Sequence, residues 1–331
     1  MNYLEDLELA YQLGDQNPEV IPILERVIAA ADVYQDIEVG VEARDLMIEA
    51  TVYNGQMKKA LQAFAWLIKK YEEKSPFVST YDILWKYKWI AGDTCGILAI
   101  SKEQIENLLA DMKTKFQENG FSLRPYYKTV AIAAEEMGNA ETAADYFAKW
   151  QATPADYMND CVACETNDVA HHHYFTGDSQ KAIQAAKPVI NGKQSCAEIP
   201  HLTYGFAALA FLDVDQPDQA AACFAKGYPL VRQEPEYLKT IGQFVAYHYQ
   251  IGDLVKAKEI IAENEVILEK SDSEMSKMLF MIHALPVVQA DSSFPEISRD
   301  LAARFDARNG NDYYSKLWQT SMDKRERDLE I

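Results

Sequence analysis

The segment GNAETAADYF at residues 138–147 combines a helix stop, a helix start and a small apolar residue followed by a large one. Glycine readily adopts the left-handed conformation that ends a helix, and Asn139 can cap the helix that follows. Similar segments recur along the chain. They are NGQMKKAL at 54–61, GDSQKAI at 177–183, DQPDQAA at 215–221 and GDLVKAK at 252–258, with weaker copies LGDQNPEVI at 13–21 and AGDTCGILAI at 91–100. This recurrence predicts helical hairpins that turn near residues 14, 55, 92, 138, 177, 215 and 252, with a further turn near Asp291.

Small and large apolar residues are regularly spaced in the helix that follows each turn. Ala143 precedes Phe147 by about one helical turn, so both lie on one face of the helix. The same spacing joins Ala60 to Phe64, Ala220 to Phe224 and Ala257 to Ile261. The small residue lets the two helices of a hairpin approach closely. The pattern therefore predicts closely packed helix pairs.

A small residue also lies seven positions before the turn in three copies, at Ala131, Ala170 and Ala208. Together with the alanine five positions after the turn, this spacing resembles the tetratricopeptide repeat, although the period here is about 38–41 residues and that of the family ~34. The resemblance covers most of the chain. It implies an all-α fold, a right-handed, tetratricopeptide-like (TPR-like) α-solenoid of about seven to eight helical hairpins.

We expect one continuous helical-repeat array over residues 1–331. The repeats are weakest over 1–120 and clearest over 121–270, and residues 271–331 are expected to form C-terminal capping helices. The segments DCVACE at 160–165 and CAEIPHLTY at 196–204 also resemble parts of uncharacterised bacterial helical-repeat proteins.

Charge and hydropathy narrow the possible partners and location. The formal net charge is −19, and such a field repels phosphate backbones, so we expect no nucleic-acid partner. No apolar run approaches the ~20 residues that a membrane span needs, so we expect no membrane association. The start of the chain, MNYLEDLELA, has acidic residues where a secretion signal would be basic. We therefore expect a cytoplasmic protein.

Two segments carry soft metal ligands, namely Cys161 and Cys164 in the first and Cys196 and His201 in the second. Three thiolates and one imidazole form an allowed closed tetrahedral set for zinc. Counted from the turns, both segments fall at the start of the first helix of consecutive repeats, and such helices run side by side in a solenoid. We expect a structural zinc that clamps these two repeats. The alternative is that the cysteines are free and pack as small apolar residues.

The sequence lacks the GxSxG, HExxH, P-loop and GxGxxG motifs, so we expect a non-enzymatic scaffold that binds a protein or peptide in its concave face. Candidate peptide-binding residues are Tyr127, His173 and His248 on first helices, with packing as the alternative role for each. The run HHH at 171–173 is not expected to bind one metal ion, because successive helical residues point about 100° apart.

Two other functions stay open at this point. Similar repeats occur in bacterial peptide receptors, a resemblance that implies an intracellular peptide-sensing regulator, here without its own DNA-binding domain. A metal-dependent hydrolase that uses the Cys/His cluster is the third possibility.

Overall fold

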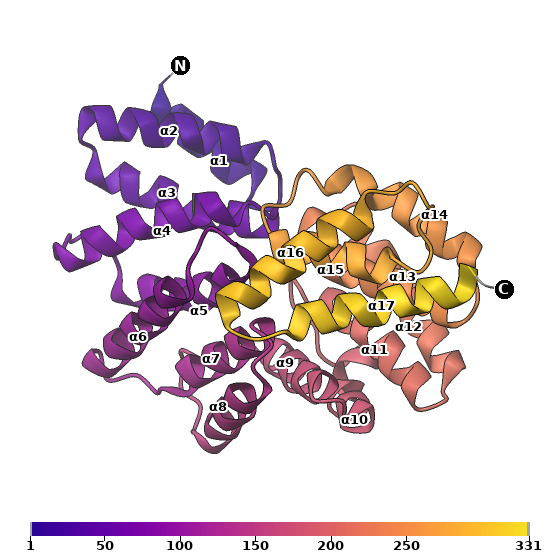
Figure 1. The fold of residues 1–331 in the computed structure, drawn as a ribbon. Helices are drawn as coiled ribbons and strands as arrows, with labels where there is room; N and C mark the ends of the chain where they lie inside the picture. The colour runs from indigo at the N-terminus through magenta and orange to yellow at the C-terminus, as the bar shows by residue number, and fades with distance from the viewer. Residues whose placement is uncertain (1, 330–331) are drawn as a thin grey trace.

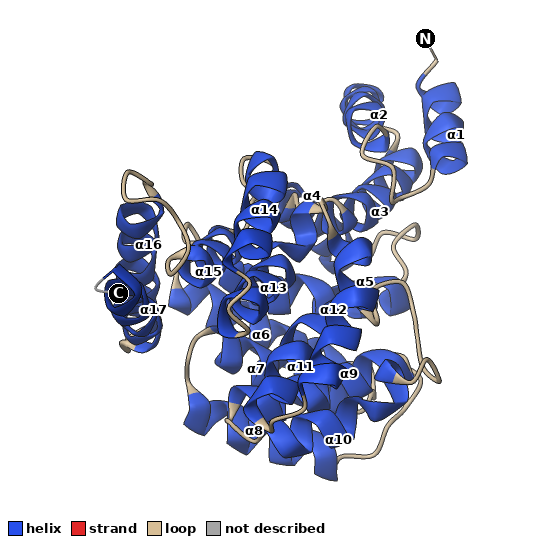
Figure 2. Ribbon diagram, turned by 90° about the vertical axis from the view of Figure 1, so that its right-hand side faces the viewer, coloured by secondary structure: helices blue, strands red, loops and turns tan. Residues whose placement is uncertain are grey.

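The computed structural model describes residues 2–329, and these form seventeen α-helices joined by turns and three short 3-10 helices, with no β-strand among them (Figures 1 and 2). The α-helices are α1 (Tyr3–Leu13), α2 (Val20–Tyr34), α3 (Ile37–Tyr53), α4 (Met57–Glu72), α5 (Thr80–Asp93), α6 (Lys102–Glu118), α7 (Arg124–Glu136), α8 (Ala140–Ala152), α9 (Val162–Phe175), α10 (Ser179–Ile190), α11 (His201–Asp213), α12 (Pro217–Val231), α13 (Leu238–Gln250), α14 (Leu254–Asn264), α15 (Glu274–Ala284), α16 (Phe294–Asn309) and α17 (Tyr313–Leu329). The 3-10 helices are η1 (Thr94–Gly96), η2 (Pro235–Tyr237) and η3 (Glu265–Ile267). The all-α prediction is therefore confirmed. No helix in this part of the chain is both long and apolar enough to cross a lipid bilayer.

Consecutive helices pack against each other as pairs, from α1 with α2 to α15 with α16. Most of the turns within pairs lie where the sequence predicts them. Glycines with positive φ occupy the turns at residues 14, 55, 138, 177 and 252, and Asp215, with φ 57°, occupies the turn between α11 and α12. The alanines that follow the turns, at 60, 143, 182, 220 and 257, are all fully buried.

The predicted turn at Gly92 is wrong. Helix α5 continues through Asp93 into η1, and α6 begins only at Lys102. The Thr94 hydroxyl donates a hydrogen bond to the carbonyl of Ala91, three residues earlier, which is compatible with continued helical geometry. The connection between this pair of helices is therefore longer than those at the turns near residues 55, 138, 177, 215 and 252.

The first helices of successive pairs also lie next to one another. Helices α5, α7, α9, α11, α13 and α15 contact each other in this order. Glycines permit the closest approaches. A Cβ atom on Gly205 of α11 would lie 2.8 Å from the Thr240 side chain of α13, and one on Gly242 of α13 would lie 2.9 Å from the Phe280 backbone of α15. Segments about forty residues apart in the sequence therefore become neighbours.

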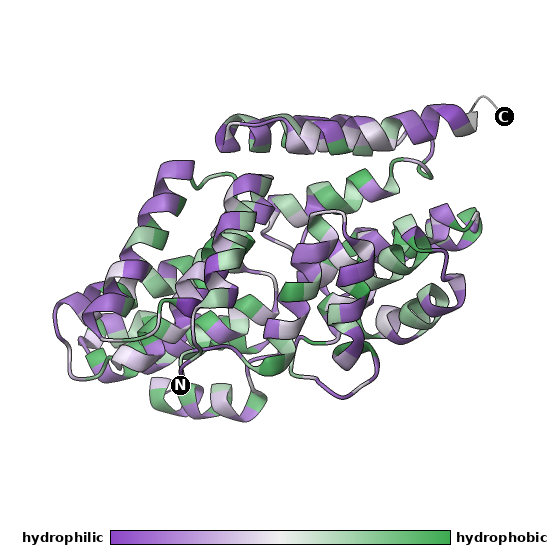
Figure 3. Ribbon diagram, turned by 90° about the horizontal axis from the view of Figure 1, so that it is seen from below, coloured by the Kyte–Doolittle hydropathy of each residue, from purple (hydrophilic) through white to green (hydrophobic). Residues whose placement is uncertain are grey.

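The C-terminal helices return to the turns of much earlier pairs, which the sequence did not predict (Figure 1). The Arg308 guanidinium donates hydrogen bonds to the carbonyls of Cys95 and Ile97, and Asn311 donates to the carbonyl of Met137. The Tyr314 hydroxyl donates to the carbonyl of Glu136. In Figure 3 the helix that leads to the C-terminus lies along one edge of the molecule and is hydrophilic over much of its length. These contacts hold the segment from α16 to α17 against the C-terminal ends of the first helices α5 and α7.

Candidate metal centre and central cavity

Three of the four predicted ligands meet at the start of α9. Cys161 is the N-cap residue of this helix, and its sulfur accepts a hydrogen bond from the backbone N–H of Cys164. The Cys164 sulfur lies 3.5 Å from that of Cys161 and 3.4 Å from that of Cys196, which belongs to the loop before α11. The three sulfur atoms all lie within 4.8 Å of one another. The structure thus unites two segments that are about thirty residues apart in the sequence.

This geometry fits a metal ion better than a disulfide. A disulfide requires sulfur atoms about 2.05 Å apart. Three sulfurs bound tetrahedrally to zinc at about 2.3 Å would be separated by about 3.8 Å, close to the spacing observed. Burial, followed by hydrogen bonds from Cys196 and Cys161, raises the pKa of the Cys164 thiol. A bound divalent cation would favour the thiolate form of these cysteines and offset the repulsion between them. The three cysteines can therefore hold a metal ion.

The structure does not bring His201 into this group. His201 begins α11, and its ring stacks on Tyr237 with the centroids 5.3 Å apart. Its Nδ1 atom is buried without a hydrogen-bond partner, and burial lowers the pKa of the imidazole. The expected closed set of four protein ligands is thus reduced to three. Among the described residues, these three cysteines form the one group of histidine, cysteine and carboxylate side chains close enough to share an ion.

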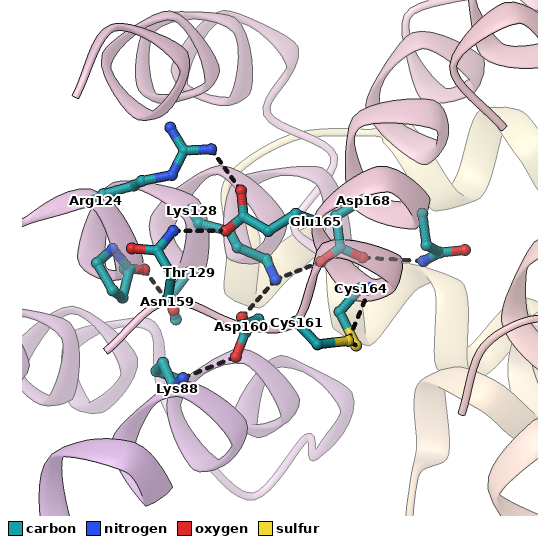
Figure 4. Close-up of polar contacts among 12 residues, drawn as sticks. Lys88, Arg124, Lys128, Thr129, Asn159, Asp160, Cys161, Cys164, Glu165 and Asp168 are labelled. Atoms are coloured by element: carbon teal, nitrogen blue, oxygen red, sulfur yellow. Dashed lines mark hydrogen bonds and ion pairs between the residues drawn. The ribbon is translucent and has the colours of Figure 1, made fainter. Parts of the chain in front are cut away.

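A network of buried ion pairs holds the segment that leads into Cys161 (Figure 4). The Lys128 ammonium of α7 lies 2.5 Å from Asp160 and 2.6 Å from Asp168 of α9. The Lys88 ammonium of α5 lies 2.8 Å from Asp160 and also donates to the carbonyl of Met158. Three first helices are therefore tied to the residue that precedes Cys161.

The opposite charges in this network shift the pKa values of Asp160 and Lys128 in favour of their ionised forms. Burial would raise the pKa of the Asp160 carboxyl, but Lys128 and Lys88 together lower it to about 2. Burial would lower the pKa of Lys128, and the two aspartates raise it above its usual value. Asp160 and Lys128 are consequently both ionised at neutral pH. A second link joins Arg124 to Glu165, 2.5 Å apart, and Asn159 donates to the same carboxylate.

Two adjoining cavities lie beside this network, with volumes of about 290 and 250 Å³. They share seven lining residues: Val52, Gly92, Asp93, Ile132, Asn167, Asp168 and Leu202. The larger cavity has walls from the seven first helices α3, α5, α7, α9, α11, α13 and α15, together with Met57 of α4. The smaller one reaches Cys164. We call the two together the central cavity.

The three predicted peptide-binding residues do not line the central cavity. Tyr127 packs against Tyr126 and Tyr146. His173 makes an edge contact with Phe147, and the buried His248 packs against Phe224 in the same way. Tyr127 packs within one helix pair, and His173 and His248 each pack against the preceding pair. These are surroundings of packing residues, and a peptide-binding role for the three stays a prediction.

The histidine run has a different role at each position. The Nδ1 atoms of His171 and His172 lie 2.9 and 2.7 Å from the two oxygens of the buried Glu135. The ring of His172 also stacks on Phe147. The expectation that the three histidines do not share one ion stays a prediction.

Sequence reasoning missed the charged residues of the first helices. Lys88, Lys128 and Asp168 look like solvated residues in the sequence, and the ionic partners of Lys128 are about 30 and 40 residues away from it. The available signal was the repeat period, which places charged residues of successive first helices at the same level. Comparisons with models of known protein families and with curated protein sequences find no match.

Proposed function

We propose that this chain is a non-enzymatic binding protein of the TPR-like α-solenoid type, whose eight helix pairs present their first helices to a ligand. The observation that carries the proposal is the central cavity, because seven helices that are separated in the sequence each supply part of its wall. Helical-repeat proteins commonly bind on the surface that their first helices form. A ligand there would touch several repeats at once.

The partner proposed here is a protein or peptide with basic residues. The chain has 51 acidic and 32 basic residues, so its field attracts cationic segments. The test is fluorescence anisotropy with a labelled oligolysine peptide and a matched oligoglutamate control, at low and high salt. We expect saturable binding of one oligolysine per chain that weakens as salt is added. Equal signals from the two peptides, or none from either, would refute the proposal.

We further propose that the cysteine group holds a structural zinc. Cys161 and Cys164 belong to one helix pair and Cys196 to the approach to the next, so a single ion would clamp the two pairs. Zinc binding stabilises a fold when its ligands come together only in the folded state. Elemental analysis of the purified protein should find one zinc per chain. The variant Cys164→Ser should lose it, and Cys223→Ala, which changes a buried cysteine elsewhere, should keep it.

A metal-dependent hydrolase is the second candidate, and one observation favours it. Only three protein ligands come together, and a zinc with three protein ligands keeps a fourth position for water or substrate. Cobalt substitution distinguishes the two functions. Added azide changes the visible spectrum if the fourth position is exchangeable, whereas a closed structural site gives the same spectrum with and without azide.

A further inference from the structure

The wall of the central cavity carries more acidic than basic groups. Eight carboxylates line it: Glu49, Asp93, Glu135, Glu136, Asp160, Asp168, Glu198 and Glu236. Its three lysines are Lys88, Lys128 and Lys239. Each lysine is already paired, Lys88 and Lys128 within the network described above and Lys239 with Glu136 at 2.5 Å. The excess negative charge is therefore not neutralised by the lining lysines.

Three of these carboxylates form no ion pair among the described residues, although Lys128 attracts Glu198 from a distance. Asp93 at the end of α5 and Glu198 in the loop before α11 make no hydrogen bond or ion pair through their side chains. Glu236 interacts with its own backbone N–H, and its Oε2 atom is buried with no partner. Isolated carboxylates in such surroundings are unfavourable unless a counter-ion is supplied.

Burial and repulsion by neighbouring carboxylates raise the pKa values of Asp93 and Glu236. Burial raises the pKa of Asp93 to about 7, and the charges of Glu198 and Glu136 add to this effect. Burial likewise raises the pKa of Glu236 to about 7, with Glu234 and Glu198 contributing. Asp93 is exposed where it lines the cavity, although protein atoms crowd around its carboxyl. A cation placed in the cavity would therefore be attracted by more than one carboxylate.

Among the described residues, no three of these carboxylates bring their oxygens within 4.8 Å of one another, as the cysteine sulfurs do, so one small ion would not contact three of them. An organic cation with two or more ammonium groups can span a larger distance. The volume also suits such a ligand, since small-molecule sites typically measure about 300–1,000 Å³ and the two adjoining parts here measure about 290 and 250 Å³.

We propose that the central cavity binds an organic polycation whose ammonium groups pair with Asp93 and Glu236. This inference rests on the proposed binding function and names the chemistry of its ligand. The ammonium groups can belong to a free polyamine or to lysine side chains of a peptide. In either case charge-assisted hydrogen bonds to these cavity carboxylates provide the recognition.

The experiment is isothermal titration calorimetry of the full-length, zinc-loaded protein with spermidine and, separately, with end-blocked trilysine. The uncharged 1,8-octanediol is the control ligand. The test variants are Asp93→Asn and Glu236→Gln. Asp218→Asn and Glu118→Gln are matched controls, because these two acids are exposed and have no polar side-chain partner.

We expect at least one of the two polycations to bind, with affinity lowered about tenfold by each cavity variant and unchanged by either control variant. The one that binds more tightly identifies the source of the ammonium groups. Binding at neutral pH should also release protons, which titrations in buffers of different ionisation enthalpy measure. Thermal melting of each variant verifies that it is folded.

Three results would overturn the inference. They are no binding of either polycation, binding that the cavity variants leave unchanged, and binding of Mg²⁺ that the same variants abolish. If oligolysine binds the wild type and the cavity variants equally well, the chain is still a binding protein and the cavity is not its cation site. If oligolysine fails to bind as well, the proposed function falls too.

Discussion

The ion-pair network at Lys128 allows a quantitative test of how the first helices are held together. The Lys128 side chain is 6% exposed, and its ammonium contacts Asp160 and Asp168, which are 15% and 20% exposed. The replacement Lys128→Met keeps the aliphatic volume and removes the charge. It leaves two partly buried carboxylates without their principal counter-ion.

Removal of one partner from a buried ion pair typically costs about 3–5 kcal/mol. We expect about 3 kcal/mol for Lys128→Met, at the lower end, because Asp160 retains Lys88 at 2.8 Å. The control is Lys149→Met, whose ammonium contacts Asp145 on the surface and is 45% exposed. Such surface pairs contribute about 0–1 kcal/mol.

The assay is urea unfolding at neutral pH, followed by circular dichroism, with the free energy of unfolding compared among variants. The double variant Lys128→Met/Asp168→Asn should recover part of the lost stability, because it removes one of the stranded charges. A loss for Lys128→Met no larger than that for Lys149→Met would refute the reasoning. The network would then contribute little to holding α7 against α9.

Three further predictions follow from the same contacts. Gly138→Ala should destabilise the protein by about 2–4 kcal/mol in urea unfolding, because the new Cβ would overlap Tyr313 at the start of α17. The control Gly177→Ala has a similar positive φ and open space around it, and it should cost about 1 kcal/mol. Equal losses of stability in the two variants would contradict the packing of α17 on this turn. The raised pKa of Glu236 means that the folded state binds its proton more tightly than the unfolded state, so the free energy of unfolding should rise as pH falls from 8 to 5. Glu236→Gln should weaken this pH dependence and stabilise the protein by about 1–2 kcal/mol at pH 8. A pH profile of stability that the variant leaves unchanged would contradict this prediction. Chelation of zinc should lower the melting temperature of the wild type and leave that of Cys161→Ser unchanged, and a response shared by both would show that the ion is bound elsewhere.

The sequence predicted the helical architecture well because its signals are local. A glycine or aspartate at the turn and an alanine five residues later specify five of the hairpins, and those alanines are all buried. Gly92 shows the limit of this signal. Asp93 and Thr94 follow it directly, but Asp93 makes no side-chain cap bond, so α5 continues into η1 and the next α-helix begins only after Ser101. The solenoid itself stays a proposal, supported by the succession of contacts between first helices.

The candidate sites were only partly predictable for a related reason. The cysteines could be found because the repeat period places the two segments side by side. His201 was expected among the ligands because it is close to Cys196 in the sequence, but α11 begins at this residue and its ring stacks on Tyr237 instead. The unpaired carboxylates of the cavity could not be recognised among 51 acidic residues. Their surroundings depend on contacts between distant segments, including those of Asp272 and Glu274 with the turn after α3 and with α4.

The most direct test of this account is zinc-edge X-ray absorption of the purified protein, which counts the sulfur atoms around the ion. If α9 and the loop before α11 are neighbours as described, the spectrum will show three sulfurs at about 2.3 Å and one lighter ligand, and Cys196→Ser will reduce the sulfur count or abolish zinc binding. A wild-type protein with two sulfurs or fewer, or with a zinc environment that Cys196→Ser does not change, would contradict it.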